Sequence, residues 1–380
     1  MKIAFVTLGF TPYRASGLDL SGERLVKGLL SEGHTITVIA GRRVGVHEVF
    51  VNPALEIFRL PLGNTDWIGF GIRTSRLLRR LEAFDIVHFW DVHFGYAYRG
   101  KYVASLQHSF RQRVISLGGI SNRNTLDWIY RYSYYRLAQH FSEMPAIKNA
   151  SGFLAGSLTS QNEFIENYGI PSEKICLARH GVDVDFFRPS EKVEELRNRL
   201  GVTRNEPVIL FAGFMTPRKG LEYLAEAMPL IHPKPKLLLV GNWRNQTYRT
   251  KIMQLLEPVK KDVIETGFVR DEELPDYYSL ADVYVSPSLL EGFGLPIAEA
   301  LACETPVVAA DSGAVAEVAG QGGILIPPRD PQAIAEAVSS LLQDPGLRSA
   351  LGKQGRANIA SELSLTRMVK DTIRAYEHFI

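Results

Sequence analysis

Short apolar runs recur along this chain, and longer segments with apolar side chains at helical spacing separate them. The first run, Lys2–Leu8, is followed by a loop containing Gly, Pro and Ser, an amphipathic stretch at Leu18–Glu32 and a second run at Thr35–Ala40. A strand, a helix and another strand in this order make a βαβ unit, and such units build parallel sheets. We therefore expect an α/β protein.

The same alternation continues along the rest of the chain. Further strands are predicted at Asp85–Trp90, Tyr102–Gln107, Gly152–Gly156, Ile175–Arg179, Pro207–Ala212, Lys236–Val240, Val263–Thr266, Val283–Ser286, Val307–Ala309 and Gly323–Ile326. Further helices are predicted at Ile72–Glu82, Trp128–Phe141, Leu158–Tyr168, Pro331–Leu342, Gly346–Ala360 and Thr366–Phe379. His180–Pro189 lies between two such sets and is interpreted as a linker. A length of 380 residues is enough for two domains, which we place at 1–185 and 186–365.

The composition indicates the class of protein and its cellular compartment. Hydrophobic residues make up 46% of the chain and charged residues 22%, as in ordinary globular proteins. The two cysteines, Cys176 and Cys303, offer neither a disulfide framework nor a metal-ligand spacing. The chain begins directly with a strand, and no apolar run is long enough to cross a bilayer. We expect a cytoplasmic protein with no nucleic-acid partner.

The most informative stretch is Glu291–Glu299, which follows the predicted strand Val283–Ser286. Pro296 suits the first turn of a helix, so the stretch predicts a strand, a glycine-containing loop and a helix start. The free N–H groups and dipole of such a helix start favour an anion. Glu291 in the loop and Glu299, which we place in the first helical turn, can accept hydrogen bonds from hydroxyls. Together these features suit a sugar nucleotide, whereas each alone also fits an ordinary turn with surface carboxylates.

A second cluster follows the predicted strand Pro207–Ala212. Arg218 and Lys219 stand there before a helix, and cations at the end of a strand are suited to holding a phosphate, bidentately in the case of arginine. The alternative is that Arg218 points into solvent.

Two glutamates separated by seven residues resemble the E-x7-E motif of retaining glycosyltransferases with two facing Rossmann-like domains, in particular glycosyltransferase family 4. That family includes glycogen-synthase-like, sucrose-synthase-like and lipid mannosyltransferase-like enzymes. Lys219-Gly220 is similar to the family's Lys-Gly pair, but Phe214 stands where the family has an arginine that contacts the diphosphate. Arg218 is the neighbouring residue that would replace it.

Weaker similarities lie in the first half. Ser16-Gly17-Leu18-Asp19 resembles the family's Gly-Gly-x-Glu stretch, with Gly17 retained. His108 ends the strand Tyr102–Gln107 and resembles the family's histidine near the reacting carbon of the sugar; the alternative is a structural histidine. His88 also ends a strand, and we interpret it as structural.

The resemblance implies a GT-B fold: two Rossmann-like domains across a cleft, with helix 366–380 packed back on the first. It implies retaining, metal-independent transfer of a hexosyl unit from a UDP- or GDP-sugar to an acceptor hydroxyl. Glu299 would hold the ribose hydroxyls, and Glu291 those of the sugar. The implied catalytic residues are His108, Lys219 and Glu291. The implied donor-binding residues are Gly17, Arg218, Lys219, Glu291, Gly292, Phe293, Gly294, Leu295 and Glu299.

Asp183-Val184-Asp185 has the spacing of a D-x-D metal site. His180–Asp183, however, resembles the Asn-Gly-Val-Asp that ends the family's first domain, so we expect neither a metal nor a cofactor. Lys219, Arg218 and helix amino ends would then neutralise the leaving diphosphate.

The distribution of charged residues along the chain indicates the chemical class of the acceptor. Residues 1–185 carry 21 Lys and Arg against 16 Asp and Glu, and the remainder carries 22 against 25. Arg73, Arg76 and Arg80 recur at helical spacing, and Trp128–Phe141 interleaves aromatic and basic residues. These features predict an anionic or lipid-linked acceptor with peripheral contact to the inner face of a membrane; a soluble sugar or sugar phosphate is the alternative. An epimerase, a glycan phosphorylase or a catalytically silent sugar-nucleotide binder of the same fold also remains open.

Overall fold

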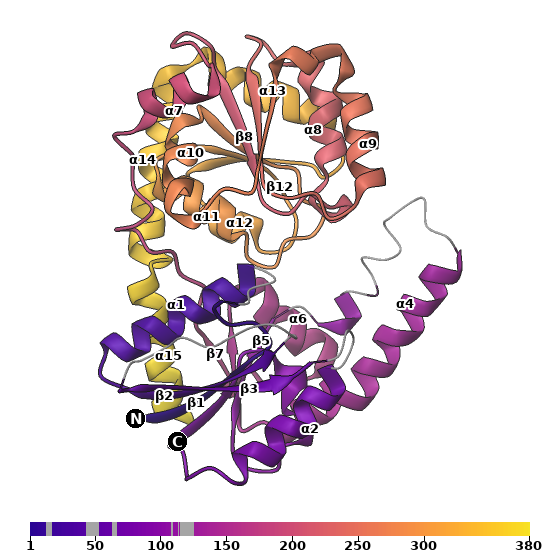
Figure 1. The fold of residues 1–380 in the computed structure, drawn as a ribbon, viewed down its shortest axis with the longest axis vertical. Coiled ribbons are helices and arrows are strands. Elements are labelled where there is room, and N and C mark those ends of the chain that lie inside the picture. The colour runs from indigo at the N-terminus through magenta and orange to yellow at the C-terminus, as the bar shows by residue number, and fades with distance from the viewer. Residues whose placement is uncertain (13–16, 43–52, 63–66, 108, 113, 115–124) are drawn as a thin grey trace. The chain divides into compact units, whose positions relative to one another are not determined.

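The computed structural model describes residues 1–12, 17–42, 53–62, 67–107, 109–112, 114 and 125–380. It separates into two compact units, drawn in Figure 1: Met1–Gly181 with Leu365–Ile380, and Val182–Ser364. The first unit ends a few residues before the boundary placed at 185. The segment interpreted as a linker is largely part of the second unit, because Val182 and Phe187 are completely buried in its core.

Each unit is built on a twisted parallel sheet. Among the described residues, the first unit has a seven-stranded sheet in the order β3-β2-β1-β4-β5-β6-β7 and the second a six-stranded sheet in the order β10-β9-β8-β11-β12-β13. The first six strands of each unit share one order, that of the doubly wound dinucleotide-binding fold. The prediction of two Rossmann-like domains is therefore confirmed. The strands are β1 Lys2–Thr7, β2 Thr35–Arg42, β3 Leu55–Pro61, β4 Ile86–Phe89, β5 Val103–Leu106, β6 Gly152–Ala155, β7 Ile175–Leu177, β8 Val208–Ala212, β9 Lys236–Val240, β10 Val263–Gly267, β11 Val283–Ser286, β12 Val307–Ala310 and β13 Gly323–Ile326.

Helices cover both faces of the first sheet, so its central strands are buried on both sides. Ile3 and Phe5 of β1 join one core and Ala4 and Val6 the other, as period-two alternation requires. Figure 1 shows α15 beside α1, although they lie at opposite ends of the chain. The helical elements of this unit are α1 Gly17–Ser31, α2 Trp67–Leu78, η1 Val92–Ala97, α4 Thr125–Ala138, the π-turn η2 Gln139–Glu143, α5 Met144–Asn149, α6 Leu158–Tyr168, η3 Ser172–Lys174 and α15 Leu365–Phe379.

The second unit repeats this construction. Ile209 and Phe211 of β8 face one core, and Leu210 and Ala212 face the other. Its helical elements are α7 Val193–Leu200, η4 Pro217–Lys219, α8 Leu221–Ala227, η5 Met228–Leu230, α9 Gln246–Leu255, η6 Glu257–Asp262, η7 Asp271–Glu273, α10 Leu274–Leu280, α11 Leu295–Ala302, α12 Val315–Ala319, α13 Pro331–Gln343 and α14 Pro345–Glu362.

Three elements of the first unit differ from the sequence-based expectation. Strand β3 was not predicted: it pairs only with β2 among the described strands, and most of its residues are half-buried, so it lacks a continuous apolar run. Helix α2 begins and ends several residues earlier than 72–82. The helix expected at 128–141 begins earlier and passes into a π-turn at Gln139–Glu143, a distortion that apolar periodicity does not reveal.

His88 has a structural position, in agreement with its interpretation. It is fully buried in β4, where its two ring nitrogens lie 2.7 Å from the hydroxyl of Tyr376 and 2.8 Å from that of Ser105. The imidazole thus joins β4 to β5 and to α15. Burial lowers the pKa of His88 from its ordinary value of 6.5 to about 3.

This lowered pKa predicts that the first unit loses stability as the pH falls below about 6.5. The unfolded chain takes up a proton there, whereas folded His88 stays neutral until about pH 3. Lowering the pH from about 7.5 to about 5.5 should reduce the free energy of unfolding by about 1.4 kcal/mol. The glutamine in the His88→Gln variant cannot titrate, so the free energy of unfolding of this variant should fall by about 1.4 kcal/mol less than that of the wild type over the same pH range. Hydrogen exchange at the β4 and β5 amides measures this, and an identical pH dependence in both proteins would contradict it.

Candidate active site

The candidate site lies in the second unit, at the carboxyl edge of its sheet. The loops that follow β8, β11 and β12 meet there, and in parallel α/β sheets this is the edge where ligands bind. Helix α11 starts in the loop after β11: Gly294 caps it with φ +94°, and Pro296 lies in its first turn, as predicted. Glu299 does not lie in the first turn, as we had expected. The helix begins only at Leu295, so Glu299 falls in the second turn.

Lys219 and Glu291 form an ion pair in this site. The Nζ of Lys219 lies 2.5 Å from Oε2 of Glu291, and only 13% and 10% of the two side chains are exposed. The sequence indicated both residues but assigned them to different parts of a ligand, and their pairing was not predicted. An ammonium group has three N–H donors, so one lysine can bind this carboxylate and a further anion together.

Glu299 is buried beside two tyrosines. The hydroxyl of Tyr278 donates a hydrogen bond to it at 3.1 Å, and the hydroxyl of Tyr284 donates to the carbonyl of Ala212 at 3.3 Å. Burial, together with the charges of Glu291 and Glu299, raises the pKa of Tyr284. Tyr284 therefore lies close to both carboxylates of the motif. Sequence reasoning missed both tyrosines, because an aromatic residue in a buried strand or helix is usually part of the core.

The loop after β12 holds the backbone at Glu291. The amide of Ala314 donates to the carbonyl of Glu291 at 3.3 Å, and the hydroxyl of Ser312 donates to the carbonyl of Ser288 at 2.7 Å. Gly313 lies between them with φ +63°, and a Cβ there would come within 2.0 Å of the Glu291 carbonyl oxygen. Only glycine allows this approach.

Arg218 is anchored to the same loop. Its guanidinium donates to the carbonyl of Leu290 at 2.6 Å, and its own carbonyl accepts from the amide of Leu289 at 2.9 Å. Arg218 thereby ties the segment after β8 to the segment before Glu291. Of the other donor-binding residues predicted in this loop, Phe293 is buried against the core, while Gly292 and Leu295 are partly exposed.

The predicted residues of the first unit are only partly covered. Gly17 is the exposed first residue of α1, whereas Ser16 and His108 lie outside the described residues. His180, which stands where the family has asparagine, is buried with its ring nitrogens 2.9 Å from the Ser21 hydroxyl and 3.2 Å from the side-chain oxygen of Gln107.

The D-x-D residues serve a local turn. A carboxylate oxygen of Asp183 accepts hydrogen bonds from the amides of Asp185 and Phe186, both at 3.1 Å. Across the part of the chain that the structure describes, no group of three or more His, Cys, Asp or Glu side chains is arranged to hold a metal ion.

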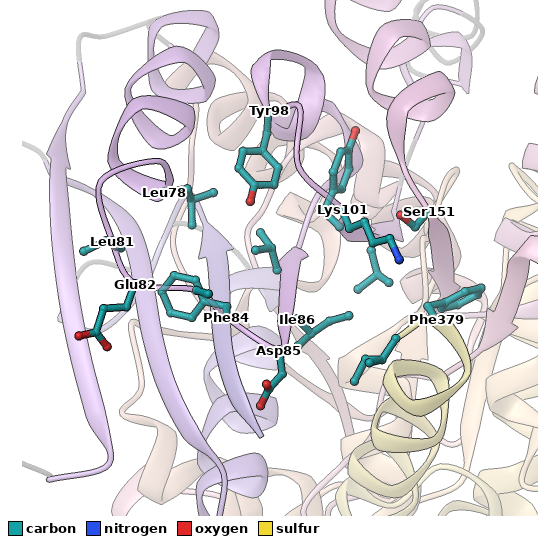
Figure 2. Close-up of a pocket in the computed structure, with 15 residues that line it drawn as sticks. Leu78, Leu81, Glu82, Phe84, Asp85, Ile86, Tyr98, Lys101, Ser151 and Phe379 are labelled. Atoms are coloured by element: carbon teal, nitrogen blue, oxygen red, sulfur yellow. The ribbon is translucent and has the colours of Figure 1, made fainter.

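A separate pocket of about 260 Å³ lies in the first unit, shown in Figure 2. It opens at the amino ends of β4 and β5, opposite the edge at which ligands bind in such sheets. The acidic side chain of Glu82 at its rim pairs with Lys2 at 2.6 Å, and Asp85 accepts from the Lys2 amide at 2.7 Å. We therefore place the candidate site at the carboxyl edge of the second sheet, where the charged groups of the motif meet.

Comparison with known proteins identifies the class of enzyme that this chain resembles. Residues 16–186 match the family described as Glycosyltransferase Family 4, and residues 192–358 match Glycosyl transferases group 1. An uncharacterised glycosyltransferase of Methanocaldococcus jannaschii is 27% identical, over 99% of this chain and 98% of that protein. Among solved structures, sucrose-phosphate synthase from Thermosynechococcus elongatus superposes with a TM-score of 0.82 at 21% identity, over 99% of this chain and 98% of that one. HepE of Anabaena, solved in complex with UDP-glucose, gives 0.76 at 20% identity, over 98% of both chains.

The fold and these matches define a glycosyltransferase of the GT-B type. Within that class, the chain is similar to glycosyltransferase family 4. In the described portion, no helix combines the length and apolar character needed to cross a membrane.

The contact at Gly313 yields a prediction. Gly313→Ala should lower enzymatic turnover about ten-fold or more, because the added methyl group displaces the backbone at Glu291. Gly201→Ala is the matched control: Gly201 has φ +68°, but an added Cβ would have no described neighbour within 4 Å. Both variants should lose about 1 kcal/mol of stability from the left-handed backbone. Parallel unfolding and activity assays separate the effects, and equal activity in the two variants would contradict the role of Gly313.

Proposed function

We propose that the protein transfers a hexosyl unit, with retention of configuration, from a nucleoside diphosphate sugar to an acceptor hydroxyl without a metal ion. The observation that carries the proposal is the Lys219–Glu291 ion pair beside the amino end of α11. This arrangement places a cation, a helix amino end and a hydroxyl-seeking carboxylate at the ligand-binding edge of one sheet.

The donor is a UDP- or GDP-sugar. HepE, whose fold this chain shares, was solved in complex with UDP-glucose. In our proposal Lys219 binds the diphosphate, Glu291 accepts hydrogen bonds from sugar hydroxyls, and Glu299 accepts them from the ribose.

The transfer step follows from these roles. The bond between the anomeric carbon and the diphosphate oxygen breaks, and the acceptor oxygen bonds to the anomeric carbon on the same face. The acceptor proton passes to the leaving phosphate oxygen. Lys219 and the amino end of α11 stabilise the charge that develops on the diphosphate, which makes stabilisation of the leaving group the main catalytic contribution.

For the acceptor we propose an anionic or lipid-linked molecule presented at a membrane surface. The support is the outer surface of α4 and its π-turn in the first unit. Large apolar side chains are exposed there, among them Tyr130 and Phe141 at 63% each and Leu137 at 57%, with exposed Arg136 beside them. Aromatic, aliphatic and basic residues in one helix suit a lipid interface.

A screen that follows nucleotide release tests the proposal. UDP- and GDP-sugars are each offered with EDTA present, with soluble sugar phosphates or with glycolipids in anionic vesicles. We expect release of the nucleoside diphosphate that requires an acceptor and survives EDTA, with the anomeric configuration retained in the product. Glu291→Gln should reduce it about ten- to hundred-fold, because the loss of a charge-assisted hydrogen bond costs about 1.5–3 kcal/mol.

Each alternative leaves a distinct result in this screen. An epimerase converts the sugar with no acceptor, a phosphorylase consumes phosphate and needs no nucleotide, and a silent binder shows binding without turnover. Any of these results would overturn the proposed transfer. Activity that disappears in EDTA and returns with Mn²⁺ would contradict its metal-free form, and wild-type turnover in Glu291→Gln would contradict the proposed site.

A further inference from the structure

The loops that follow β8 and β9 are joined beyond the ends of their strands. The amide of Gly213 donates to the carbonyl of Val240 at 2.9 Å, and that of Met215 donates to the carbonyl of Asn242 at 3.0 Å. Gly241 makes this possible: with φ +128°, a Cβ at this residue would come within 2.1 Å of the Gly213 carbonyl oxygen. The residues that follow β8 and those that follow β9 therefore continue side by side at the carboxyl edge of the sheet.

This pairing brings Arg244 onto Phe214. The guanidinium carbon of Arg244 lies 3.8 Å from the centre of the Phe214 ring, which is 38% exposed. Phe214 is the residue that stands where the family has an arginine. The sequence therefore lacks a cation at this position, but the structure supplies one from the adjacent loop. An aromatic ring contacts the flat face of a guanidinium. The N–H groups lie in the plane of the guanidinium, and phosphate oxygens accept hydrogen bonds from them in that plane.

Two further cations near this edge, Arg218 and Lys219, each have a partner in the loop after β11. Arg218 donates to the carbonyl of Leu290, and the charge of Lys219 is offset by that of Glu291. A diphosphate brings additional negative charge to the site, so its neutralisation calls for a second cation. Arg244 lies in the loop after β9, the strand next to β8, and its guanidinium rests on Phe214 at the edge where the charge of the diphosphate would lie.

We propose that Arg244, stacked on Phe214, is a diphosphate-binding residue and takes the place of the arginine that this chain lacks at position 214. The proposal rests on the proposed function, because it concerns the diphosphate of that same donor. It assigns Arg218 a positioning role at Leu290 and makes Phe214 the support for the guanidinium.

Calorimetric titration with UDP, UMP, GDP and GMP tests the assignment. With whichever diphosphate binds the wild type, Arg244→Gln should weaken binding about ten-fold or more and leave binding of the matching monophosphate within about two-fold. Phe214→Leu should weaken diphosphate binding less, because the cation remains but its support is lost. Arg204→Gln is the control for net charge: Arg204 is exposed and precedes β8, at the opposite edge of the sheet, so binding should stay unchanged.

A double variant provides the stronger test. Phe214→Arg combined with Arg244→Gln puts the cation where the family has it and should restore at least half of the lost diphosphate affinity on a logarithmic scale. A merely structural role for the Arg244–Phe214 stack predicts the opposite, since the double variant destroys the stack completely. Circular dichroism and thermal unfolding of each variant confirm that the fold is intact.

The outcomes separate this inference from the proposed function. Normal diphosphate binding by Arg244→Gln, alongside weakened binding by Lys219→Ala, overturns the role of Arg244 and leaves the proposed donor site standing. Equal losses for the diphosphate and the monophosphate, or no recovery in the double variant, also overturn it. If the wild type binds none of the four nucleotides, the proposed function itself fails.

Discussion

The buried pairing of Lys219 with Glu291 is the interaction on which the rest of the site depends. One partner follows β8 and the other follows β11, so the ion pair connects two adjacent strands at their carboxyl ends. Removing either partner leaves a largely buried charge uncompensated, which is costly. An ion pair of this kind contributes little net stability but fixes where both charges stand, and a ligand with phosphate and hydroxyl groups requires such fixed positions.

The surrounding contacts keep this pair in place. Arg218 binds the carbonyl before Glu291, and the amide of Ala314 binds the carbonyl of Glu291 itself. Gly313 and Gly241 each allow a backbone approach that a side chain would block. Rigid strands and tightly joined loops thus position charges that solvent would otherwise screen, as electrostatic stabilisation of a leaving group requires.

The fold could be predicted well from the sequence because the apolar runs are short, regular and buried on both faces. Strand β3 was not predicted because it lies beside a single described neighbour and is half-buried.

The glutamates and Lys219 could be identified because each follows a predicted strand. Their pairing could not, since residues 219 and 291 are far apart in sequence and meet only through strand order. Arg244 also follows a predicted strand, and the same rule would have found it; its stacking on Phe214 depends on strand order as well.

The most direct test of the central claim is a crystal structure of the protein with UDP or GDP bound. We expect the diphosphate within hydrogen-bond distance of Lys219 Nζ and of the first amides of α11, with the carboxylate of Glu291 directed toward the vacant sugar position. A diphosphate bound away from the carboxyl edge of the second sheet, or one that makes no contact with Lys219, would contradict the account.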